Sequence, residues 1–387
     1  MAVSWMFARR TPLAWRNLTH QRTAMVIYVA AVSFAVLVMF MQLGFLNGLY
    51  DSQTCLVRSL RADLLMLSRA RHSLATHESF SRNRLVQAAG CVGVEDVYPL
   101  YLEDSTKTYV RDPRSGDENA LLVIGFRPED PVFAIEDIER QLPALSSLGT
   151  TLFDTRSRSL FGPLRRGTVT ELNSQKVRVV GTFAMGANYL HDGTLVMRDE
   201  SLFRLFPSQR AERVALGLIQ LEHGADVDGV MRELRRRLPG DVDVMTRDQV
   251  IEREKEFWRK ATPAGYVFGL GVVVGFVIGV ITCYQILYTN IVDHLRQLAT
   301  LKAMGYRDRD VVGIVIRQSL LLSLLGFGPG VVMSACVYAI LTSLTAIGMY
   351  LIVGRVAFIL SLTVAMCVAS AGLAVRKALA ADPAELF

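Results

Sequence analysis

Four long apolar runs constrain the fold of this chain more than any other feature of its sequence. They cover residues 24–48, 263–288, 311–342 and 355–375. A run of about 20 apolar residues is long enough to cross the hydrocarbon core of a bilayer as a helix. The sequence therefore predicts an integral membrane protein with four transmembrane helices.

The composition shows that these helices are only part of the molecule. A mean hydropathy of +0.31 with 51% hydrophobic residues is too apolar for an ordinary soluble protein, yet 20% of the residues are charged. Most of the charge lies in residues 49–262, between the first two runs, and a segment of that length can bury a core of its own. We expect a large separate domain there.

Basic residues flank the apolar runs and predict their orientation. Short segments rich in Lys and Arg stay on the cytoplasmic side. Residues 1–23, where aromatic residues alternate with arginines, are expected to form an amphipathic cytoplasmic segment, and residues 376–387 a cytoplasmic tail. Residues 49–262 and the short loop 343–354 then lie on the outer side. Much of the net charge of +6 is in these flanks, so it does not indicate nucleic-acid binding; the arginines and lysine concerned are Arg9, Arg10, Arg16, Arg22, Arg376 and Lys377.

Residues 289–310 form a charged island between the second and third runs. Their arginines and lysine place them in the cytoplasm, and apolar residues recur in them at helical spacing. Two interpretations stay open: a docking surface for a soluble partner, or a plain turn between membrane helices. The apolar residues are Ile291, Leu295, Leu298, Leu301 and Met304.

Small residues in the second and third runs predict close helix packing. Gly271, Gly275 and Gly279 follow each other at four-residue spacing, which lets two helix backbones approach closely. The partner helix lies either within the chain or across a dimer, and of the two we favour the dimer. Pro329, beside Gly328 and Gly330, predicts a kink in the third helix.

The segment between the first two runs has an α+β pattern. Helical spacing continues past residue 48 to Leu60, and Thr246 with Gln249 has the spacing of a capping box at the start of a helix to Lys260. These two helices are either stalks that carry the domain or ordinary amphipathic helices packed on it. Between them we expect a small porter-like subdomain with an insertion at about 111–207. The expected strands are 63–67, 92–100, 120–126, 176–183, 193–197, 214–221 and 242–245, and the expected helices are 77–89, 200–206 and 226–238.

No pattern in the sequence predicts catalysis, a metal site or a bound cofactor. The segment from Gly162 to Thr168 has the glycine spacing of a P-loop but lacks its lysine. The six histidines are scattered, and His191 beside Asp192 is expected in a turn. Cys55 and Cys91 could pair on the outer side, but no spacing argues for it, so we expect free thiols.

Several motifs resemble a known family. The stretches Leu13-Ala14-Trp15, Met39 to Phe45, Asp293-His294-Leu295, Ala299 to Tyr306 and Ala381 to Phe387 are similar to those of DevC-type permeases, a branch of the MacB/FtsX-like ABC transporter permeases. The resemblance implies four transmembrane helices with a large MacB-like α+β extracytoplasmic domain on helical stalks. It also implies that residues 289–310 couple to an ATPase through Asp293, His294, Leu295, Gln297, Leu298, Leu301, Lys302, Met304 and Gly305.

The same resemblance gives the expected function and partners. It implies the permease subunit of an efflux system in the inner membrane. This chain would not be an enzyme, because ATP and Mg²⁺ would be bound by a partner ABC ATPase. The other implied partners are a second copy of the chain, a periplasmic membrane-fusion adaptor, an outer-membrane TolC-like channel and membrane lipids. The alternative is an FtsX-like signalling scaffold that activates a periplasmic partner without export. A receptor that works without an ATPase would leave the island 289–310 unexplained.

Overall fold

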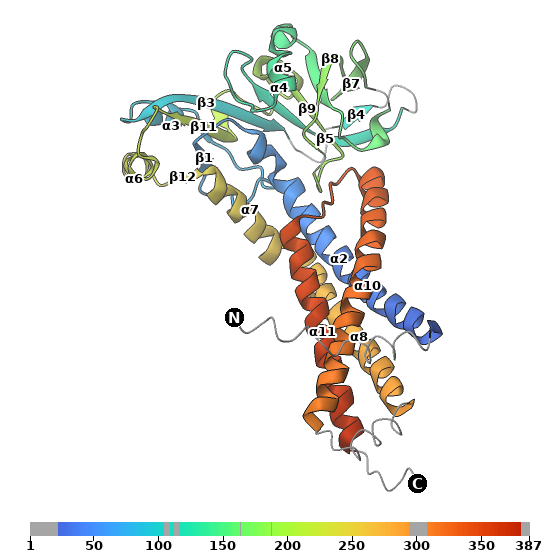
Figure 1. The fold of residues 1–387 in the computed structure, drawn as a ribbon. Coiled ribbons are helices and arrows are strands. Elements are labelled where there is room, and N and C mark those ends of the chain that lie inside the picture. Colours follow the sequence, from blue (N-terminus) through green and yellow to red (C-terminus); the bar gives the residue numbers. More distant parts are fainter. Residues whose placement is uncertain are drawn as a thin grey trace, which may run out of the picture. The chain divides into compact units, whose positions relative to one another are not determined.

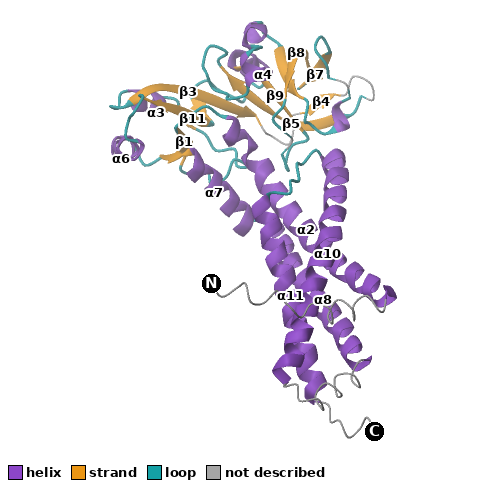
Figure 2. Ribbon diagram, in the orientation of Figure 1, coloured by secondary structure: helices purple, strands orange, loops and turns teal. Residues whose placement is uncertain are grey.

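The protein is seen in a computed structural model that describes residues 22–103, 109–111, 116–162, 164–186, 188–293 and 308–380. The chain divides into two compact units. The helical unit comprises Met1–Leu46, Tyr266–Ile340 and Met349–Phe387, and the α+β domain comprises Asn47–Gly265 with Leu341–Gly348. Figures 1 and 2 show the helices of the first unit and the sheet of the second. The predicted fold class, four apolar helices and a large α+β domain, is confirmed.

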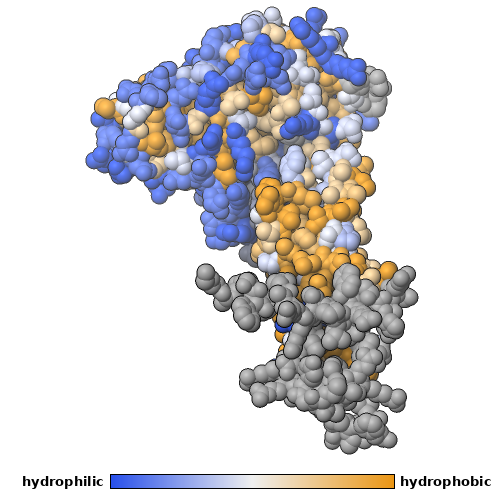
Figure 3. Space-filling model, in the orientation of Figure 1, coloured by the Kyte–Doolittle hydropathy of each residue, from blue (hydrophilic) through white to orange (hydrophobic). Residues whose placement is uncertain are grey.

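Four helices supply the helical unit. They are α2 (Arg22–Ser59), α8 (Pro263–Asp293), α10 (Asp308–Thr345) and α11 (Val353–Ala380). Each contains a stretch long and apolar enough to cross a membrane: Met25–Ser59, Pro263–Thr289, Val315–Thr345 and Val353–Arg376. Figure 3 shows apolar side chains gathered over the helices, whereas the surface of the α+β domain is largely hydrophilic.

Two of these helices can be compared with detailed predictions from the sequence. The helix α2 continues without a break past Gly48 to Ser59, as its apolar spacing predicts. Pro329 lies inside α10, which is helical on both sides of it. The hydroxyl of Ser334, one turn further on, donates to the carbonyl of Gly330 at 2.7 Å. The predicted kink at Pro329 stays a prediction.

The α+β domain is built on one sheet of ten strands in the order β12-β1-β11-β3-β5-β4-β7-β8-β6-β9. The strand β5 also pairs with β9, so the last six strands close into a ring. The strands β12, β1, β11 and β3 form an antiparallel extension of it. The bounds are β1 Leu64–Ser68, β3 Val94–Glu103, β4 Tyr109–Arg111, β5 Glu118–Phe126, β6 Thr150–Asp154, β7 Val169–Leu172, β8 Gln175–Phe183, β9 Gly193–Arg198, β11 Leu216–Leu221 and β12 Val242–Thr246.

The strand β3 joins the two parts of the sheet. Its residues from Val94 to Leu100 pair with β11, and Tyr101 to Glu103 pair with β5. The ring strands β4 to β9 fall within 109–198, inside or beside the stretch that the sequence predicts as an insertion. The domain therefore has two parts that share one continuous strand.

Short elements account for the differences from the sequence prediction. The expected helix 77–89 is wrong in its first half, where Phe80–Ser81 is the strand β2 and only Asn83–Ala89 is the helix α3. Phe80 pairs with Val214 of β10 (Arg213–Val214) and is buried, and this tertiary contact overrides the local helical spacing. The sequence also missed β4, β6 and β7. The remaining helical elements are α4 Glu136–Glu139, η2 Leu142–Ser146, η3 Ser159–Phe161, α5 Asp199–Leu205, α6 Val227–Arg237 and α7 Arg247–Lys260.

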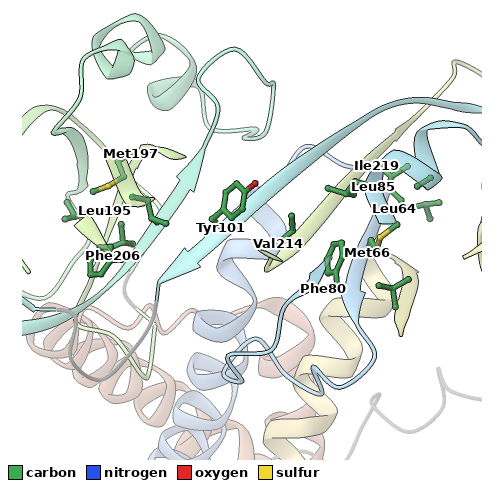
Figure 4. Close-up of a cluster of buried hydrophobic side chains, with 14 of the residues drawn as sticks. Leu64, Met66, Phe80, Leu85, Tyr101, Leu195, Met197, Phe206, Val214 and Ile219 are labelled. Carbon is green, nitrogen blue, oxygen red and sulfur yellow. The ribbon is translucent and has the colours of Figure 1, made fainter. Parts of the chain in front are cut away.

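Apolar side chains fill both faces of the sheet. One cluster combines the ring interior with residues under α3, α5 and α6, and Figure 4 shows part of it, including Phe80, Tyr101 and Val214. The second cluster contains Leu56 and Val57 from the end of α2, and Val250 and Ile251 from α7. The ends of both helices are thus part of the core of the domain.

Candidate functional site

The predicted coupling region lies almost wholly outside the described residues. The helix α8 ends at Asp293 and α10 begins at Asp308. Asp293 is described only as the last residue of α8. The other eight predicted positions, which are His294, Leu295, Gln297, Leu298, Leu301, Lys302, Met304 and Gly305, stay predictions.

The helix that leads into this region is held on two sides. Leu287 and Ile291, in the last turns of α8, are buried against Val315 of α10 and Ala371 of α11. The hydroxyl of Ser370 in α11 also donates to the carbonyl of Val280 in α8 at 2.9 Å. The helix α8, which leads into the predicted cytoplasmic segment 289–310, is therefore packed against both α10 and α11.

The glycine face of α8 packs within the chain. A Cβ placed on Gly275 would lie 3.1 Å from the side chain of Val38, and one on Gly279 would overlap the side chain of Met366 in α11 and lie 3.1 Å from Ala35. A Cβ on Gly271 would overlap the side chain of Gln42. These neighbours lie within the chain, on α2 and, for Gly279, also on α11, so our preference for a dimer contact at this face is wrong. The glycines let α8 and α2 approach closely, as small residues do in membrane helix pairs.

The same helix α2 makes a second close contact, with α10, that the sequence analysis missed. The hydroxyl of Ser33 donates to the carbonyl of Gly326 at 2.8 Å. A Cβ on Gly330 would lie 2.7 Å from Val36, and the hydroxyl of Tyr338 donates to the carbonyl of Phe40. Gly326 and Gly330 have the same four-residue spacing as the glycines of α8, which was the available signal. The helix α2 is thus the common partner of α8 and α10.

In the α+β domain, α7 is fixed by a buried carboxylate. Glu254 is 2% exposed, and it accepts hydrogen bonds from the Ser73 hydroxyl at 2.7 Å, the Leu74 amide at 2.8 Å and the Trp258 indole at 2.9 Å. The predicted capping box is confirmed, since Thr246 and Gln249 exchange both of its hydrogen bonds. The helix α7 therefore packs on the domain, and its core-facing side includes one polar residue.

A second buried carboxylate fixes the loop that follows β8. Asp154 accepts the backbone amides of Arg156 at 2.9 Å, Met185 at 3.0 Å and Gly186 at 2.7 Å. Burial raises the pKa of Asp154 above its ordinary value, and the three amide hydrogen bonds oppose that rise. Each carboxylate also binds groups that are distant in the chain, which sequence patterns do not reveal: Met185 and Gly186 for Asp154, and Ser73 and Leu74 for Glu254.

The described residues contain no group of three or more His, Cys, Asp or Glu side chains placed to hold a metal. Gly162 to Thr168 leads into the strand β7, whereas a P-loop opens a helix. The ring of His191 lies 3.1 Å from Asn188 Oδ1, within the expected turn. Cys55 and Cys91 are both free thiols, as predicted.

Comparison with known proteins adds a family match. Residues 267–383 match the model of the FtsX-like permease C-terminal family. An uncharacterized ABC transporter permease of Methanocaldococcus jannaschii is 22% identical over 187 residues, which cover 47% of this chain. The alignment covers 45% of that relative, so this chain spans less than half the length of the curated protein it matches.

Two solved structures align with part of this chain at low similarity scores. The periplasmic region of MacB from Actinobacillus actinomycetemcomitans aligns with a TM-score of 0.35 and 9% identity, over 51% of this chain and 94% of that one. The extracellular domain of the noncanonical ABC-type transporter YknZ from Gram-positive bacteria aligns with a TM-score of 0.33 and 12% identity, over 48% and 99% of the two chains. The sequence match is the firmer result: from within α8 to beyond the end of α11, this chain is similar to the FtsX-like permease C-terminal domain.

Proposed function

We propose that this chain is the permease subunit of an ABC-type efflux system of the DevC type. The observation that carries the proposal is the match of residues 267–383 to the FtsX-like permease C-terminal family. In the proposal the chain forms a homodimer in the inner membrane, with the α+β domain in the periplasm. It has no catalytic site of its own, and a separate ABC ATPase binds ATP and Mg²⁺. A periplasmic adaptor and an outer-membrane TolC-like channel complete the system.

The helical unit supports a mechanical role for the segment 289–310. The last turns of α8 are packed against α10 and α11, so a displacement of the segment would move three helices together. The helix α2 contacts α8 and α10 and is itself continuous to Ser59. Its final turns are buried in the second core cluster of the α+β domain. In the proposal, ATPase closure is passed along these helices to the periplasmic domain.

The first test removes the apolar pair in the coupling segment. Leu295 and Leu298 are three residues apart and would share a helix face. Because a few buried anchors carry most of the energy of an interface, Leu295→Ala with Leu298→Ala should reduce the ATPase that copurifies by about tenfold or more. The measurement is copurified ATPase per permease, together with the thermal melt of the detergent-solubilised chain.

A matched control removes an apolar pair from the exposed face of α8. Val273 is 57% exposed and Val277 is 47% exposed. Val273→Ala with Val277→Ala removes similar apolar area and should leave copurification unchanged. If the leucine pair lowers the melt but copurification stays normal, the leucines pack on the membrane interface and the coupling assignment fails.

Two further tests address the division of labour and the topology. The purified chain alone should neither bind nor hydrolyse ATP, and micromolar nucleotide binding without a copurifying ATPase would refute the proposal.

The topology is tested with single introduced cysteines in intact cells. A cysteine at Asp117 should be labelled from outside, and a cysteine at Arg376 should be protected. The reverse pattern would invert the orientation.

The alternative function is an FtsX-like signalling scaffold that activates a periplasmic partner without export. Both functions use an ATPase, so the periplasmic partner distinguishes them. Purification from cells in mild detergent should recover an adaptor and an outer-membrane channel if the chain belongs to an efflux system. Recovery of a cell-wall hydrolase without those two would favour the scaffold.

A further inference from the structure

An exposed apolar pair lies at the tip of the segment that joins β8 to β9. Tyr189 is 50% exposed and Leu190 is 45% exposed. Most large apolar side chains of the α+β domain are instead buried in its two core clusters. Adjoining exposed apolar side chains often mark a contact surface, because their exposure to water is unfavourable. The pair is therefore a candidate contact surface.

Hydrogen bonds hold this tip in one conformation. The side-chain oxygen of Asn188 accepts the backbone amides of Leu190 at 2.9 Å and His191 at 2.6 Å. Asp154 fixes the beginning of the segment through the amide hydrogen bonds described above. A tip that is already shaped loses less conformational entropy when it makes a contact.

On one side the tip adjoins the start of a membrane span. The ring of Tyr189 lies against that of Trp258, with 6.0 Å between the ring centroids and an angle of 72° between the planes. The carbonyl of Trp258 accepts the hydroxyl of Thr262 at 2.6 Å. Thr262 directly precedes the apolar stretch Pro263–Thr289 of α8. Tyr189 thus contacts a residue one helical turn from the point where this span begins.

On the other side the same segment adjoins the end of a second span. The backbone amide of Arg158 donates to the carbonyl of Asp192 at 2.7 Å, and the two side chains form an ion pair. Arg158 Nε also donates to the carbonyl of Thr345 at 3.2 Å. Thr345 is the last residue of α10 and of its apolar stretch. Because Asp192 is only two positions beyond Leu190, the ends of two spans bracket the tip, and all these residues belong to the α+β unit.

The end of a membrane span lies in the headgroup layer of the bilayer, which is about 5 to 8 Å thick on each side. Tyrosine and tryptophan are enriched in that layer, because each combines an apolar ring with a polar group that reaches water. Tyr189 and Trp258 are such a pair. The nearby basic residues are partly neutralised, since Arg259 and Lys260 pair with Glu256 at 3.9 and 2.6 Å. The site is therefore suited to insertion among lipids rather than to attraction by anionic headgroups.

We propose that Tyr189 and Leu190 insert into the headgroup layer of the bilayer on the side of the α+β domain. The partner is a lipid surface, whether zwitterionic or anionic. The insertion attaches the strand ring to the membrane at a place other than the helices of the chain. Any displacement of the ring away from the bilayer then has to withdraw this pair from lipid. The proposal depends on the four membrane spans and not on the efflux function.

The test uses a photoreactive diazirine amino acid placed at residue 190 of the full chain. The chain is reconstituted into phosphatidylcholine nanodiscs and illuminated, and mass spectrometry measures lipid and water adducts at that residue. Lipid adducts should exceed those from the same probe at residue 148 by about tenfold or more, because an inserted apolar side chain is surrounded by lipid. Adding phosphatidylglycerol to the nanodiscs should leave the yield at residue 190 unchanged.

Leu148 is the matched position because it is also an exposed leucine, 52% exposed. It precedes β6, whose other end carries Asp154, so it lies about 20 Å along the strand from the tip segment. With the probe at residue 190, Tyr189→Ser should lower the lipid adduct roughly threefold or more, because it removes the neighbouring ring from the lipid. Val86→Ser removes an exposed apolar side chain from α3 and should leave the adduct unchanged.

Three results would overturn the proposal. One is a predominance of water adducts at both residue 190 and residue 148, which would mean that the tip faces solvent. Another is an unchanged lipid adduct in Tyr189→Ser. The third is crosslinking of residue 190 to a protein instead of lipid in native membranes, which would make the tip a docking site for a periplasmic partner. If Tyr189→Ser fails to fold, the comparison of residues 190 and 148 in the otherwise native chain still decides the result.

Discussion

The helical unit and the α+β domain bury their polar groups in different ways. In the helical unit, glycines bring backbones together and hydroxyls bond to helix carbonyls, as Ser33 does to Gly326 and Ser370 to Val280. In the α+β domain, carboxylates accept groups of amide and side-chain hydrogen bonds, as Asp154 and Glu254 do. A hydroxyl is uncharged, so it can be buried between helices that lipid surrounds. The α+β domain can also bury charged carboxylates, because several donors hydrogen-bond to each of them.

Their outer surfaces differ for the same reason. On α8, Val273, Val277 and Ile281 are each about half exposed and recur at four-residue spacing, on a helix whose glycine face meets α2. Lipid is as apolar as these side chains, so no hydrophobic force drives them inward and close packing must hold the helices instead. In the α+β domain water supplies that force, and two large apolar clusters fill the faces of the sheet. The comparison predicts where each unit is most sensitive to substitution.

The largest effect is expected for Glu254→Ala in the α+β domain. This change leaves the Ser73 hydroxyl, the Leu74 amide and the Trp258 indole without their acceptor in a buried site. Each unsatisfied buried donor costs about 1 kcal/mol or more, so we expect a loss of about 3 kcal/mol in the free energy of unfolding. The measurement is denaturant unfolding of the full chain, followed by Trp fluorescence.

Glu252→Ala is the control for that prediction. Glu252 is 66% exposed and forms a surface ion pair with Lys255 at 3.4 Å. Such pairs contribute little, so its loss should cost at most about 0.5 kcal/mol. Equal effects of the two substitutions would mean that the buried carboxylate does not hold α7 on the domain.

A smaller effect is expected in the helical unit from Gly330→Ala and Gly326→Ala. The added Cβ would lie 2.7 Å from Val36 at the first position and 2.5 Å from Val32 at the second. Overpacking of this kind costs about 1 to 3 kcal/mol, and the thermal melt in detergent should fall accordingly. Gly313, in the same helix, has nothing within 4 Å of its Cβ position.

Gly313→Ala should therefore leave the melt unchanged or raise it slightly, since alanine is favoured over glycine within a helix by about 1 kcal/mol. If all three alanine variants melt alike, close backbone approach is not what holds α2 to α10. The helical unit would then not differ from the α+β domain by its dependence on close backbone contacts.

The smallest effect concerns a carboxylate that lacks the hydrogen bonds of Asp154 and Glu254. Burial raises the pKa of Asp130 to about 6, partly offset by the charge of Arg127. A raised carboxyl pKa means that stability is greatest below the unfolded value and is lost as pH rises through about 6. Asp130→Asn should therefore stabilise the domain by about 1 kcal/mol at pH 7 and have no effect near pH 4.

Melts of the wild type and this variant across that pH range provide the measurement. Glu129→Gln, at the exposed neighbouring residue, is the control and should show a much smaller change. A pH-independent difference for Asp130→Asn would show that the Asp130 carboxylate is not desolvated.

The sequence determined those features of the fold that depend on local pattern. Apolar runs long enough to span a membrane predict α2, α8, α10 and α11, and the capping box predicts the start of α7. The α+β character followed from short strands rich in β-branched or large apolar residues, alternating with helical segments. The similarity to FtsX-like permeases was also accessible, because its motifs lie in continuous stretches. The coupling residues from His294 to Gly305 stay predictions, since they fall outside the described part of the chain.

Tertiary structure alone decided which distant residues meet. Ser33 and Gly326 are 293 positions apart, and Ser73 and Glu254 are 181 positions apart. The four-residue glycine spacing of α8 showed that some backbone would approach closely, but only the packed helices showed that it is α2 of the same chain. The pairing of β5 with β9 likewise closes the ring through a contact that no local pattern encodes. A helix or strand is specified largely by its own residues. Its packing partner depends on the whole chain, because every surface that could pack against it competes for that contact.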